Sequence, residues 1–467
     1  MLFSSASFLF YFLPITVILY FAVPDRYRNG ILLMASLIFY FWGEPKYSLL
    51  MLFSAFSGYL HGLWIEAARK TKWAKVPVVS SVIVHLALLA FFKYADFFIG
   101  NINGVFGSSI PLLKIVLPIG ISFYTFQILS YTIDVYRGEA CVQKSFIRFA
   151  TYVSLFPQLI AGPIVRYSTV EDELKDRAHS IEGFAAGVSR FVVGLSKKIL
   201  IADALAELIR HLEESAGPTV LGYFIIAVAF TLQIYFDFSG YSDMAIGLGR
   251  IFGFHFLENF NYPYISRSIT EFWRRWHISL GTWFRDYVYI PLGGNRVGRA
   301  RWYLNILIVW FLTGFWHGAE WNFILWGVYF GVLLLIEKNF LLAALQKLPA
   351  AVGHLYTMAL VVFGFVLFRA NSFAGALESF SGMFGGQGVP FASAETLYYL
   401  RSYAAVLALA FVASTPLFQK LLCLLRNRPA ARRLLRVAEP MSVALLLILA
   451  AGYLVDGSFS PFLYFRF

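Results

Sequence analysis

The sequence predicts an all-α polytopic membrane protein. Of its 467 residues, 59% are hydrophobic and only 14% are charged, whereas soluble domains carry about 25% charged residues. Mean hydropathy is +0.68, and apolar stretches recur along the whole chain. The 49 Phe, 27 Tyr and 11 Trp fit the same class, because aromatic rings fill gaps between helices and sit at headgroup level.

Twelve apolar stretches are candidate spans, because about 20 helical residues cross the hydrocarbon core of a bilayer. The first has neither a preceding basic region nor a small-residue cleavage site, so we expect a retained helix and not a signal peptide. Together they predict about 11–12 transmembrane helices. They cover residues 8–23, 31–44, 46–65, 76–98, 114–133, 184–203, 218–249, 302–317, 321–338, 351–369, 398–418 and 441–455.

Lys and Arg in the connecting loops predict the orientation, because they concentrate on the cytoplasmic side. We expect the cationic segments 66–75 and 420–436 to be cytoplasmic. Segment 371–397 has no Lys or Arg and segment 203–217 is net acidic, so both are expected to face outward. Alternating spans then put both termini outside, and topology explains the net charge of +12 better than a nucleic-acid partner does.

Two stretches differ from simple spans. Residues 152–166 are apolar but contain Pro157, Gly162 and Pro163, and Pro kinks a helix. Irregular backbone survives at membrane depth only when it is buried in protein or lines a cavity, so we predict a re-entrant element here. Residues 265–301 interleave aromatic residues with seven arginines, which predicts amphipathic helices at the cytoplasmic interface.

His317 is the leading candidate for a functional residue. An ionisable ring is costly to bury in hydrocarbon, and an unperturbed pKa of about 6.5 suits proton transfer near neutral pH. The alternative is a purely structural role, as a core histidine hydrogen-bonded between helices. Thr313, Trp316, Glu320 and Asn322 surround it with polar groups, which favours a site.

His277 lies in a segment, residues 272–287, where Arg and Trp alternate. Such spacing suits an interfacial helix whose guanidiniums stay in water while the indoles bury. Arginines such as Arg274, Arg275 and Arg285 also match phosphate oxygens bidentately, so a phosphate-bearing cytosolic ligand is an alternative to interface anchoring. His277 itself is equally compatible with an anchor and with a site residue.

Another polar group interrupts a long apolar run. Asp237 and Asp243, with Ser239 and Ser242, are too polar for lipid exposure, so they are expected to face the protein interior or an aqueous cavity. A polar clasp between helices beside a kink at Gly240 is the favoured interpretation, ahead of direct catalysis or ligand contact.

Motifs of several enzyme classes are absent from the sequence. There is no GxSxG elbow, no Walker loop, no HExxH and no run of acidic metal ligands. Serine hydrolase, ATPase and metalloprotease activities therefore lack support. A channel or secondary transporter would also need many spans and intramembrane ionisable groups, but it predicts inverted repeats, and none is evident.

Several motifs resemble the membrane-bound O-acyltransferase family, in particular the bacterial branch that contains the alginate O-acetyltransferase membrane subunit. The similarity runs nearly end to end. The matching motifs are MLFSS at the start, FPQLIAGPIVR from Phe156, YFDFSGYSDMAIGLGRIFGF from Tyr235, NFNYPYISRSITEFWRRWHISLGTWFRDYVYIPLGGNR from Asn259, TGFWHGAEWNFILWG from Thr313 and LFRANSF from Leu367.

This resemblance implies transmembrane and re-entrant helices around a central tunnel, with His317 at the principal catalytic position and His277 at the second. It also implies acetyl-CoA as the acyl donor, no tightly bound cofactor, and transfer to an extracytoplasmic polysaccharide through a separate SGNH-type acetyltransferase partner. The expected location is the bacterial cytoplasmic membrane. D-alanyl transfer to teichoic acid stays open as an alternative.

In the expected mechanism His317 is the general base that removes the acceptor hydroxyl proton, a contribution of about 10²–10⁴-fold. Donors near Gly314 or on Trp316 or Asn322 would stabilise the oxyanion. The residues expected to contact the acyl donor or to line the tunnel are Arg274, Arg275, Arg285, Asp237, Ser239, Asp243, Trp316 and Asn322.

The domain organisation follows from the absence of internal repeats and of a separable soluble region. We expect residues 1–467 to form one integral membrane domain. Residues 1–255 would hold the N-terminal helices, residues 256–340 the catalytic core and residues 341–467 the C-terminal helices. Cys141 and Cys423 lie far apart with no metal-ligand spacing, which indicates inert thiols and no metal site.

Overall fold

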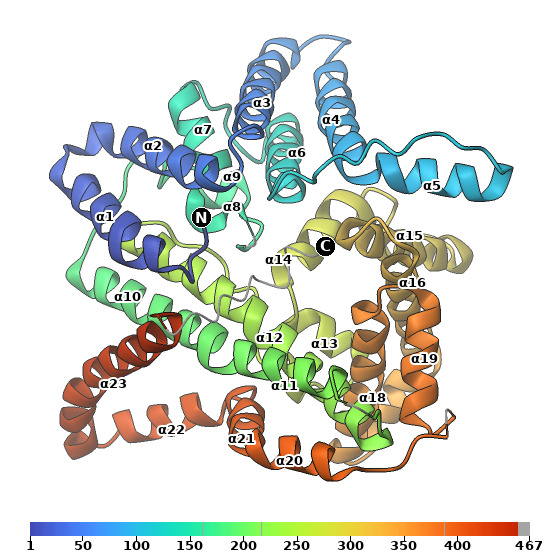
Figure 1. The fold of residues 1–467 in the computed structure, drawn as a ribbon. Coiled ribbons are helices and arrows are strands. Elements are labelled where there is room, and N and C mark those ends of the chain that lie inside the picture. The colour runs from blue at the N-terminus through green and yellow to red at the C-terminus, as the bar shows by residue number, and fades with distance from the viewer. Residues whose placement is uncertain (161, 216, 387, 456–467) are drawn as a thin grey trace. The chain divides into compact units, whose positions relative to one another are not determined.

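The computed structural model describes residues 1–160, 162–215, 217–386 and 388–455, and within these ranges the chain is helical without any strand (Figure 1). The predicted all-α class is confirmed, and each predicted apolar stretch overlaps a helix. The cause is physical: backbone N–H and C=O groups cannot stay unpaired in hydrocarbon, and a helix pairs them within one segment.

Six helices or continuous helical runs in the described part of the chain are long and apolar enough to cross a bilayer. A seventh forms if Ala394–Ser402 and Ala404–Ala413, which meet at a bend of 52°, act as one span. The remaining predicted stretches do not meet this criterion, so the larger number of spans stays a prediction. The six are Ser48–Ala68, Val76–Phe106, Val220–Ile251, Trp321–Lys347, Ala350–Arg369 and Pro429–Val455.

The described residues group into two compact units, the first made of residues 1–191 and 241–257. In this unit α3 packs against α4, α6 and α7 (Figure 1). Its elements are η1 Phe8–Phe12, α1 Leu13–Ala22, α2 Asp25–Gly43, α3 Ser48–Ala68, α4 Val76–Leu89, η2 Ala90–Tyr94, α5 Ala95–Phe106, α6 Ile121–Arg137, α7 Phe146–Ser154, α8 Phe156–Leu159, α9 Tyr167–Val170 and the first part of α10 Ile181–Ser196.

The segment predicted to be re-entrant, residues 152–166, is irregular and buried. α7 ends at Ser154, α8 is a single turn, and a non-helical stretch leads to α9. Its Ala161 lies outside the described residues. Buried irregular backbone is what the prolines predicted, and its depth in a membrane stays a prediction.

The second unit is made of residues 192–240 and the described residues from 258 onward. α12 runs from this unit into the first. The elements are η3 Lys197–Ala202, α11 Asp203–Glu213, α12 Val220–Ile251, η4 Pro263–Ile265, α13 Ile269–Arg275, α14 Ile278–Phe284, η5 Arg285–Tyr289, α15 Arg299–His317, α16 Trp321–Ile336, η6 Glu337–Leu341, α17 Leu342–Lys347, α18 Ala350–Arg369, α19 Phe373–Met383, α20 Ala394–Ser402, α21 Ala404–Ala413, α22 Leu417–Arg426 and α23 Pro429–Val455.

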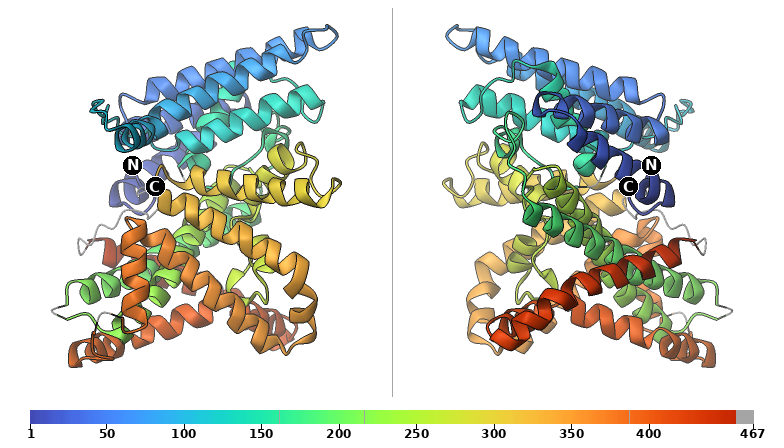
Figure 2. Two further views of the ribbon diagram at one scale, coloured as in Figure 1. Left: turned by 90° about the vertical axis from the view of Figure 1, so that its right-hand side faces the viewer. Right: turned by 90° about the vertical axis from the view of Figure 1, so that its left-hand side faces the viewer.

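The central helix pair of the second unit is α15 and α16, which lie side by side (Figure 2). Glycines allow this approach. A Cβ on Gly314 would collide with the backbone carbonyl of Phe323, and one on Gly327 with that of Trp310. Small residues at a helix interface are the usual device for close packing in membranes, and here they fix the position of the end of α15.

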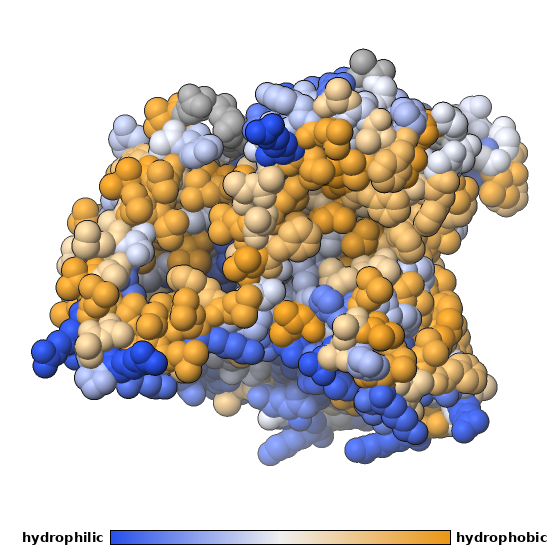
Figure 3. Space-filling view, turned by 90° about the horizontal axis from the view of Figure 1, so that it is seen from below, coloured by the Kyte–Doolittle hydropathy of each residue, from blue (hydrophilic) through white to orange (hydrophobic). Residues whose placement is uncertain are grey.

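The outer helices of the second unit expose apolar side chains, among them Leu409, Phe411, Phe418 and Leu424. Figure 3 shows hydrophobic residues over much of one face, with hydrophilic residues gathered along an edge. Soluble monomers rarely expose apolar patches of this extent. The surface therefore suits acyl chains.

Candidate functional site

The two predicted histidines line one cavity in the second unit. Its volume is about 600 Å³, within the range of roughly 300–1,000 Å³ that small-molecule sites occupy. The ring centroids of His277 and His317 are 6.4 Å apart. Arg274, Arg285, Trp310, Thr313 and Lys338 also line it.

His317 is the last residue of α15. Its ring packs against those of Trp316, Trp326 and Phe368, at centroid distances of 5.0, 5.1 and 5.5 Å. A side chain at Gly318 would collide with the ring of Phe323, so only glycine fits at the position that follows His317. His317 is thus held by aromatic packing and also borders the cavity. A histidine that served only core packing would not need to border a cavity.

His277 lies in the left-handed backbone region, with φ 46° and ψ 52°, between α13 and α14. Residues other than glycine rarely adopt this conformation, and strained residues of this kind cluster at functional sites. The side chain is 2% exposed, so the histidine is not an anchor at the water interface. Burial lowers the pKa of His277 to about 3, and the ring is therefore neutral near pH 7.

Asn259, which is fully buried, fixes the orientation of His277. Asn259 Oδ1 accepts hydrogen bonds from the backbone N–H of Ser279 at 3.1 Å and from Ser279 Oγ at 2.9 Å, so this atom is the amide oxygen. His277 Nδ1 lies 3.2 Å from the same oxygen and must carry the proton. The lone pair is then on Nε2, which has no hydrogen-bond partner among the residues that the structure describes.

Glu337 holds the start of the short helix α13. Its buried carboxylate accepts hydrogen bonds from the backbone N–H groups of Ile269 at 2.6 Å and Thr270 at 2.9 Å, and from the Thr270 hydroxyl at 2.8 Å. These are donors that a helix cannot satisfy internally. The clamp fixes the helix that carries Arg274 and leads into His277.

Three cations, Arg274, Arg285 and Lys338, line the same cavity as the histidines. Arg285 also pairs with Asp286 at 2.6 Å. Arg275, predicted with them, does not line the cavity. Its guanidinium pairs with Glu271 at 2.9 Å and donates to the backbone carbonyl of Asn261 at 3.1 Å.

Other predicted residues lie elsewhere. Trp316 packs on both histidine rings without lining the cavity. The Asn322 amide donates one of its two N–H groups to the backbone carbonyl of Ala370 at 2.6 Å, and Asn322 does not line the cavity. Its expected role at an oxyanion stays a prediction.

Asp237, Ser239 and Asp243 are also not among the residues that line this cavity. Asp237 pairs with buried Lys198 at 2.7 Å, and Asp243 pairs with Arg190 at 2.6 Å. These are the contacts of a polar clasp, the favoured interpretation.

The helix α12 continues through Gly240 without a break, and the expected kink there stays a prediction. The glycine also has a packing role. A Cβ there would lie 2.8 Å from the backbone carbonyl of Gly194, so its absence allows α12 to approach α10 closely.

Sequence reasoning missed Asn259, Glu337 and Lys338. Asn259 opens a motif that was noticed only as a resemblance, and its role depends on a contact across 18 residues. Glu337 and Lys338 end an apolar run and looked like an ordinary helix boundary.

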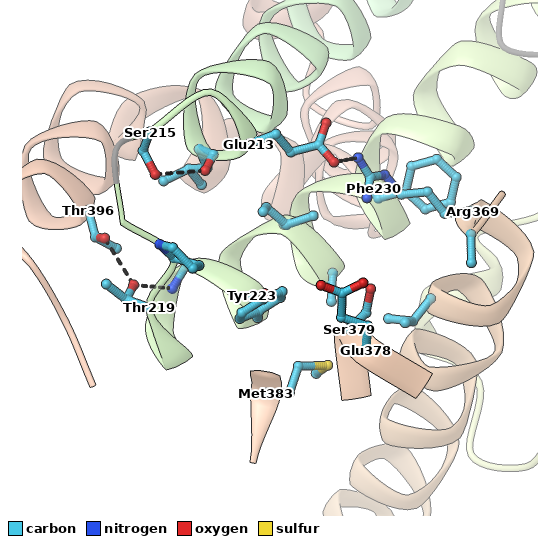
Figure 4. Close-up of a pocket in the computed structure, with 17 residues that line it drawn as sticks. Glu213, Ser215, Thr219, Tyr223, Phe230, Arg369, Glu378, Ser379, Met383 and Thr396 are labelled. Atoms are coloured by element: carbon cyan, nitrogen blue, oxygen red, sulfur yellow. Dashed lines mark hydrogen bonds and ion pairs between the residues drawn. The ribbon is translucent and has the colours of Figure 1, made fainter. Parts of the chain in front are cut away.

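A second cavity of about 360 Å³ lies in the same unit. Figure 4 shows Glu213 of α11 paired with Arg369 at the end of α18, and Thr219 hydrogen-bonded to Thr396. Phe368, which touches the His317 ring, immediately precedes Arg369. One turn of α18 therefore borders both the aromatic packing of His317 and this polar cavity.

Comparison with known proteins identifies the family. A model of the MBOAT, membrane-bound O-acyltransferase family, matches residues 37–376. The chain is 41% identical to a probable alginate O-acetylase AlgI of Azotobacter vinelandii and 42% identical to one of Pseudomonas putida, with 100% of both chains covered in each case. It is 34% identical to a peptidoglycan O-acetyltransferase of Helicobacter pylori, over 83% of this chain and 81% of that protein. The protein is a multi-pass membrane enzyme that transfers acyl groups, and it belongs to the membrane-bound O-acyltransferase family.

Proposed function

We propose that this enzyme transfers acetyl groups from cytosolic acetyl-CoA across the bacterial cytoplasmic membrane, for O-acetylation of an extracytoplasmic polysaccharide such as alginate. The observation that carries the proposal is one cavity lined by two histidines and three cations. Relatives named for acetyl transfer, at 34–42% identity, favour an acetyl group over D-alanine.

The donor side of the proposal depends on charge. Coenzyme A carries several phosphates, and guanidinium groups bind phosphate oxygens bidentately. Arg274, Arg285 and Lys338 would hold these phosphates, while the thioester at the far end of the pantetheine arm reaches the histidines. The donor is a substrate, and no tightly bound cofactor is needed.

The chemical step assigns His317 the role of general base. Its imidazole takes the proton of the acceptor hydroxyl as that oxygen attacks the thioester carbonyl, and a tetrahedral intermediate forms. The intermediate collapses with loss of the thiolate, which recovers a proton from the imidazolium. His277, neutral with an available lone pair on Nε2, is placed to accept a hydrogen bond from the hydroxyl or from water.

The acceptor side uses the second cavity. Ser379 and Tyr223 line it with a hydroxyl and an aromatic ring, groups that bind a glycan or a polar protein segment, and Arg369 lines it with its charge balanced by Glu213 (Figure 4). The further carboxylate of Glu378 favours a polar segment of a partner protein over direct entry of a polyanion such as alginate. We propose that the acceptor approaches from here, either as polysaccharide or as the hydroxyl nucleophile of an SGNH-type partner that completes transfer to the glycan.

The test is acetyl transfer by the purified enzyme in proteoliposomes. With acetyl-CoA supplied and an alginate oligosaccharide plus an SGNH-type partner as acceptor system, we expect release of free coenzyme A thiol and a glycan heavier by one acetyl group. A D-alanine-loaded carrier protein is the parallel donor. Turnover of that carrier and not of acetyl-CoA would contradict the proposal and favour teichoic acid D-alanylation.

Charge removal at the cavity should affect donor use selectively. Arg274→Gln is expected to raise the KM for acetyl-CoA about tenfold, the effect of losing one charge-assisted hydrogen bond, with kcat changed less. Arg275→Gln is the matched control, because Arg275 is in the same helix but pairs with Glu271 outside the cavity. Equal KM values for the two variants would remove Arg274 from donor binding.

Loss of the Asn259 side chain should reduce turnover through His277. Asn259→Ala deprives Nδ1 of its acceptor, so the ring can rotate or change tautomer, and about 1–3 kcal/mol of transition-state stabilisation is expected to be lost. Initial rates at saturating acetyl-CoA measure it. Asn261→Ala, at an exposed position that contacts Arg275 through its backbone carbonyl, should keep wild-type rates. Unchanged kcat in folded Asn259→Ala would show that His277 needs no orientation.

A further inference from the structure

A cavity in the first unit shares no residue with the histidine cavity. Its volume is about 640 Å³. It is bounded by the end of α1, the start of α10 and the end of α12 with the residues that follow. The lining residues that matter below are Val17, Phe21, His179, Ser180, Phe184 and Arg250.

One side of this cavity is apolar and open to the surroundings. Phe21 and Phe184 meet edge to face with ring centroids 6.0 Å apart, and they are 39% and 37% exposed. Ile181 beside them is 85% exposed, and Ile18 one turn back along α1 is 66% exposed. Exposed aliphatic and aromatic side chains at the end of an apolar helix are what the boundary of a bilayer favours.

The other side of the cavity is polar and cationic. Arg250 is exposed at the cavity, and no carboxylate within the described ranges forms an ion pair with it. Ser180 Oγ accepts a hydrogen bond from the Gly183 N–H at 2.9 Å, so its own hydroxyl proton is available to a ligand. This side therefore offers two donors to an anion.

The charged residues around this cavity also bear on its affinity for an anion. Burial, followed by the positive charges of Arg28 and Arg177, lowers the pKa of His179. Arg28 is balanced by Asp25 at 2.6 Å, whereas Arg177 donates to the uncharged side chain of Asn29 at 2.8 Å. Glu173, which pairs with the lining residue His255 at 2.7 Å, offsets the charge of Arg177, so Arg250 is the cation at this cavity that no ion pair within the described ranges balances.

We propose that this cavity binds an anionic glycerophospholipid, with its phosphate at Arg250 and Ser180 and its acyl chains along Phe21, Phe184 and the exposed face of α1. Basic pockets at the cytoplasmic ends of membrane helices bind such headgroups. A soluble phosphate compound would use the same donors but would leave the adjoining apolar surface without a partner. The inference is independent of the acyl-transfer reaction.

Lipid binding to the purified full-length enzyme in detergent tests the proposal. Native mass spectrometry would compare phosphatidylglycerol with phosphatidylcholine of the same acyl chains, and glycerol 3-phosphate would serve as the soluble anion. We expect selective retention of phosphatidylglycerol. Arg250→Gln should weaken its binding about tenfold, as loss of one charge-assisted contact predicts, and Arg250→Lys should recover part of the affinity.

Arg26→Gln is the matched control, because Arg26 is an exposed cation that stacks over Tyr27 and does not line the cavity. It should bind phosphatidylglycerol like the wild type. Equal retention of the two lipids, or equal weakening in Arg26→Gln and Arg250→Gln, would overturn the proposal. Binding of glycerol 3-phosphate as tight as that of phosphatidylglycerol would also overturn it, and would assign a soluble anion instead.

Discussion

Replacement of His317 with Gln is expected to abolish acetyl transfer, with a fall in kcat of about 10²–10⁴-fold or more, the usual contribution of a general base. Gln keeps the approximate volume and a hydrogen-bonding group, so the aromatic packing against Trp316, Trp326 and Phe368 should survive. The loss would then report the missing proton acceptor and not a collapsed site. Release of coenzyme A thiol in proteoliposomes, with acetyl-CoA and acceptor both saturating, measures it.

A histidine elsewhere in the bundle separates this effect from a general need for imidazole groups. His61 in α3 is half-buried and hydrogen-bonds to Ser57 and Ser80, and it does not line the cavity of His277 and His317. His61→Gln should therefore keep near-wild-type kcat. If His317→Gln folded normally and retained full activity, His317 would not be the base, and His277 would be the remaining imidazole at the cavity.

The sequence was sufficient to predict the helices, because a helix forms from residues that are adjacent in the chain. A run of apolar residues in hydrocarbon must pair its own backbone groups, so the run itself predicts the helix. The same holds for His317, whose polar neighbours in the sequence indicated a site, whereas the pattern around His277 was equally compatible with an anchor. Their proximity in space, 6.4 Å between ring centroids, follows from packing of α13, α14 and α15 that no local pattern encodes.

The contacts between side chains of different helices could not be predicted, because no local sequence pattern encodes them. Arg274 and Arg275 are adjacent in the sequence and chemically identical, yet only Arg274 lines the cavity. Arg275 pairs with Glu271 four residues earlier in the same helix, a local contact, whereas the groups that face Arg274 come from other elements. The role of Asn259 depends on the left-handed backbone conformation of His277, which a histidine at this position does not predict. Side-chain direction on a short helix is set by its neighbours, and the sequence does not state which neighbours those are.

Lys198 shows how a buried charge depends on its partners. Its side chain is 2% exposed, and Nζ lies 2.7 Å from Asp237 and 2.8 Å from Asp203. Two carboxylates around one ammonium leave no spare positive charge. The ions are costly to bury, but removal of the cation is costlier, because it leaves like charges facing each other in a medium that hardly screens them.

Lys198→Met is therefore expected to destabilise the enzyme by about 3–5 kcal/mol, the range found when one partner of a buried ion pair is removed. Thermal unfolding of the purified protein in detergent would show a markedly lower midpoint. Lys175→Met is the control, because Lys175 pairs with Glu171 and Asp172 at the surface, and such pairs contribute little. The variant Lys198→Met/Asp203→Leu/Asp237→Leu should recover much of the loss, since an apolar set of similar volume carries no unpaired charge. If the single and triple variants unfolded alike, the cost would come from packing around α12, and Asp237 would need another role than holding Lys198.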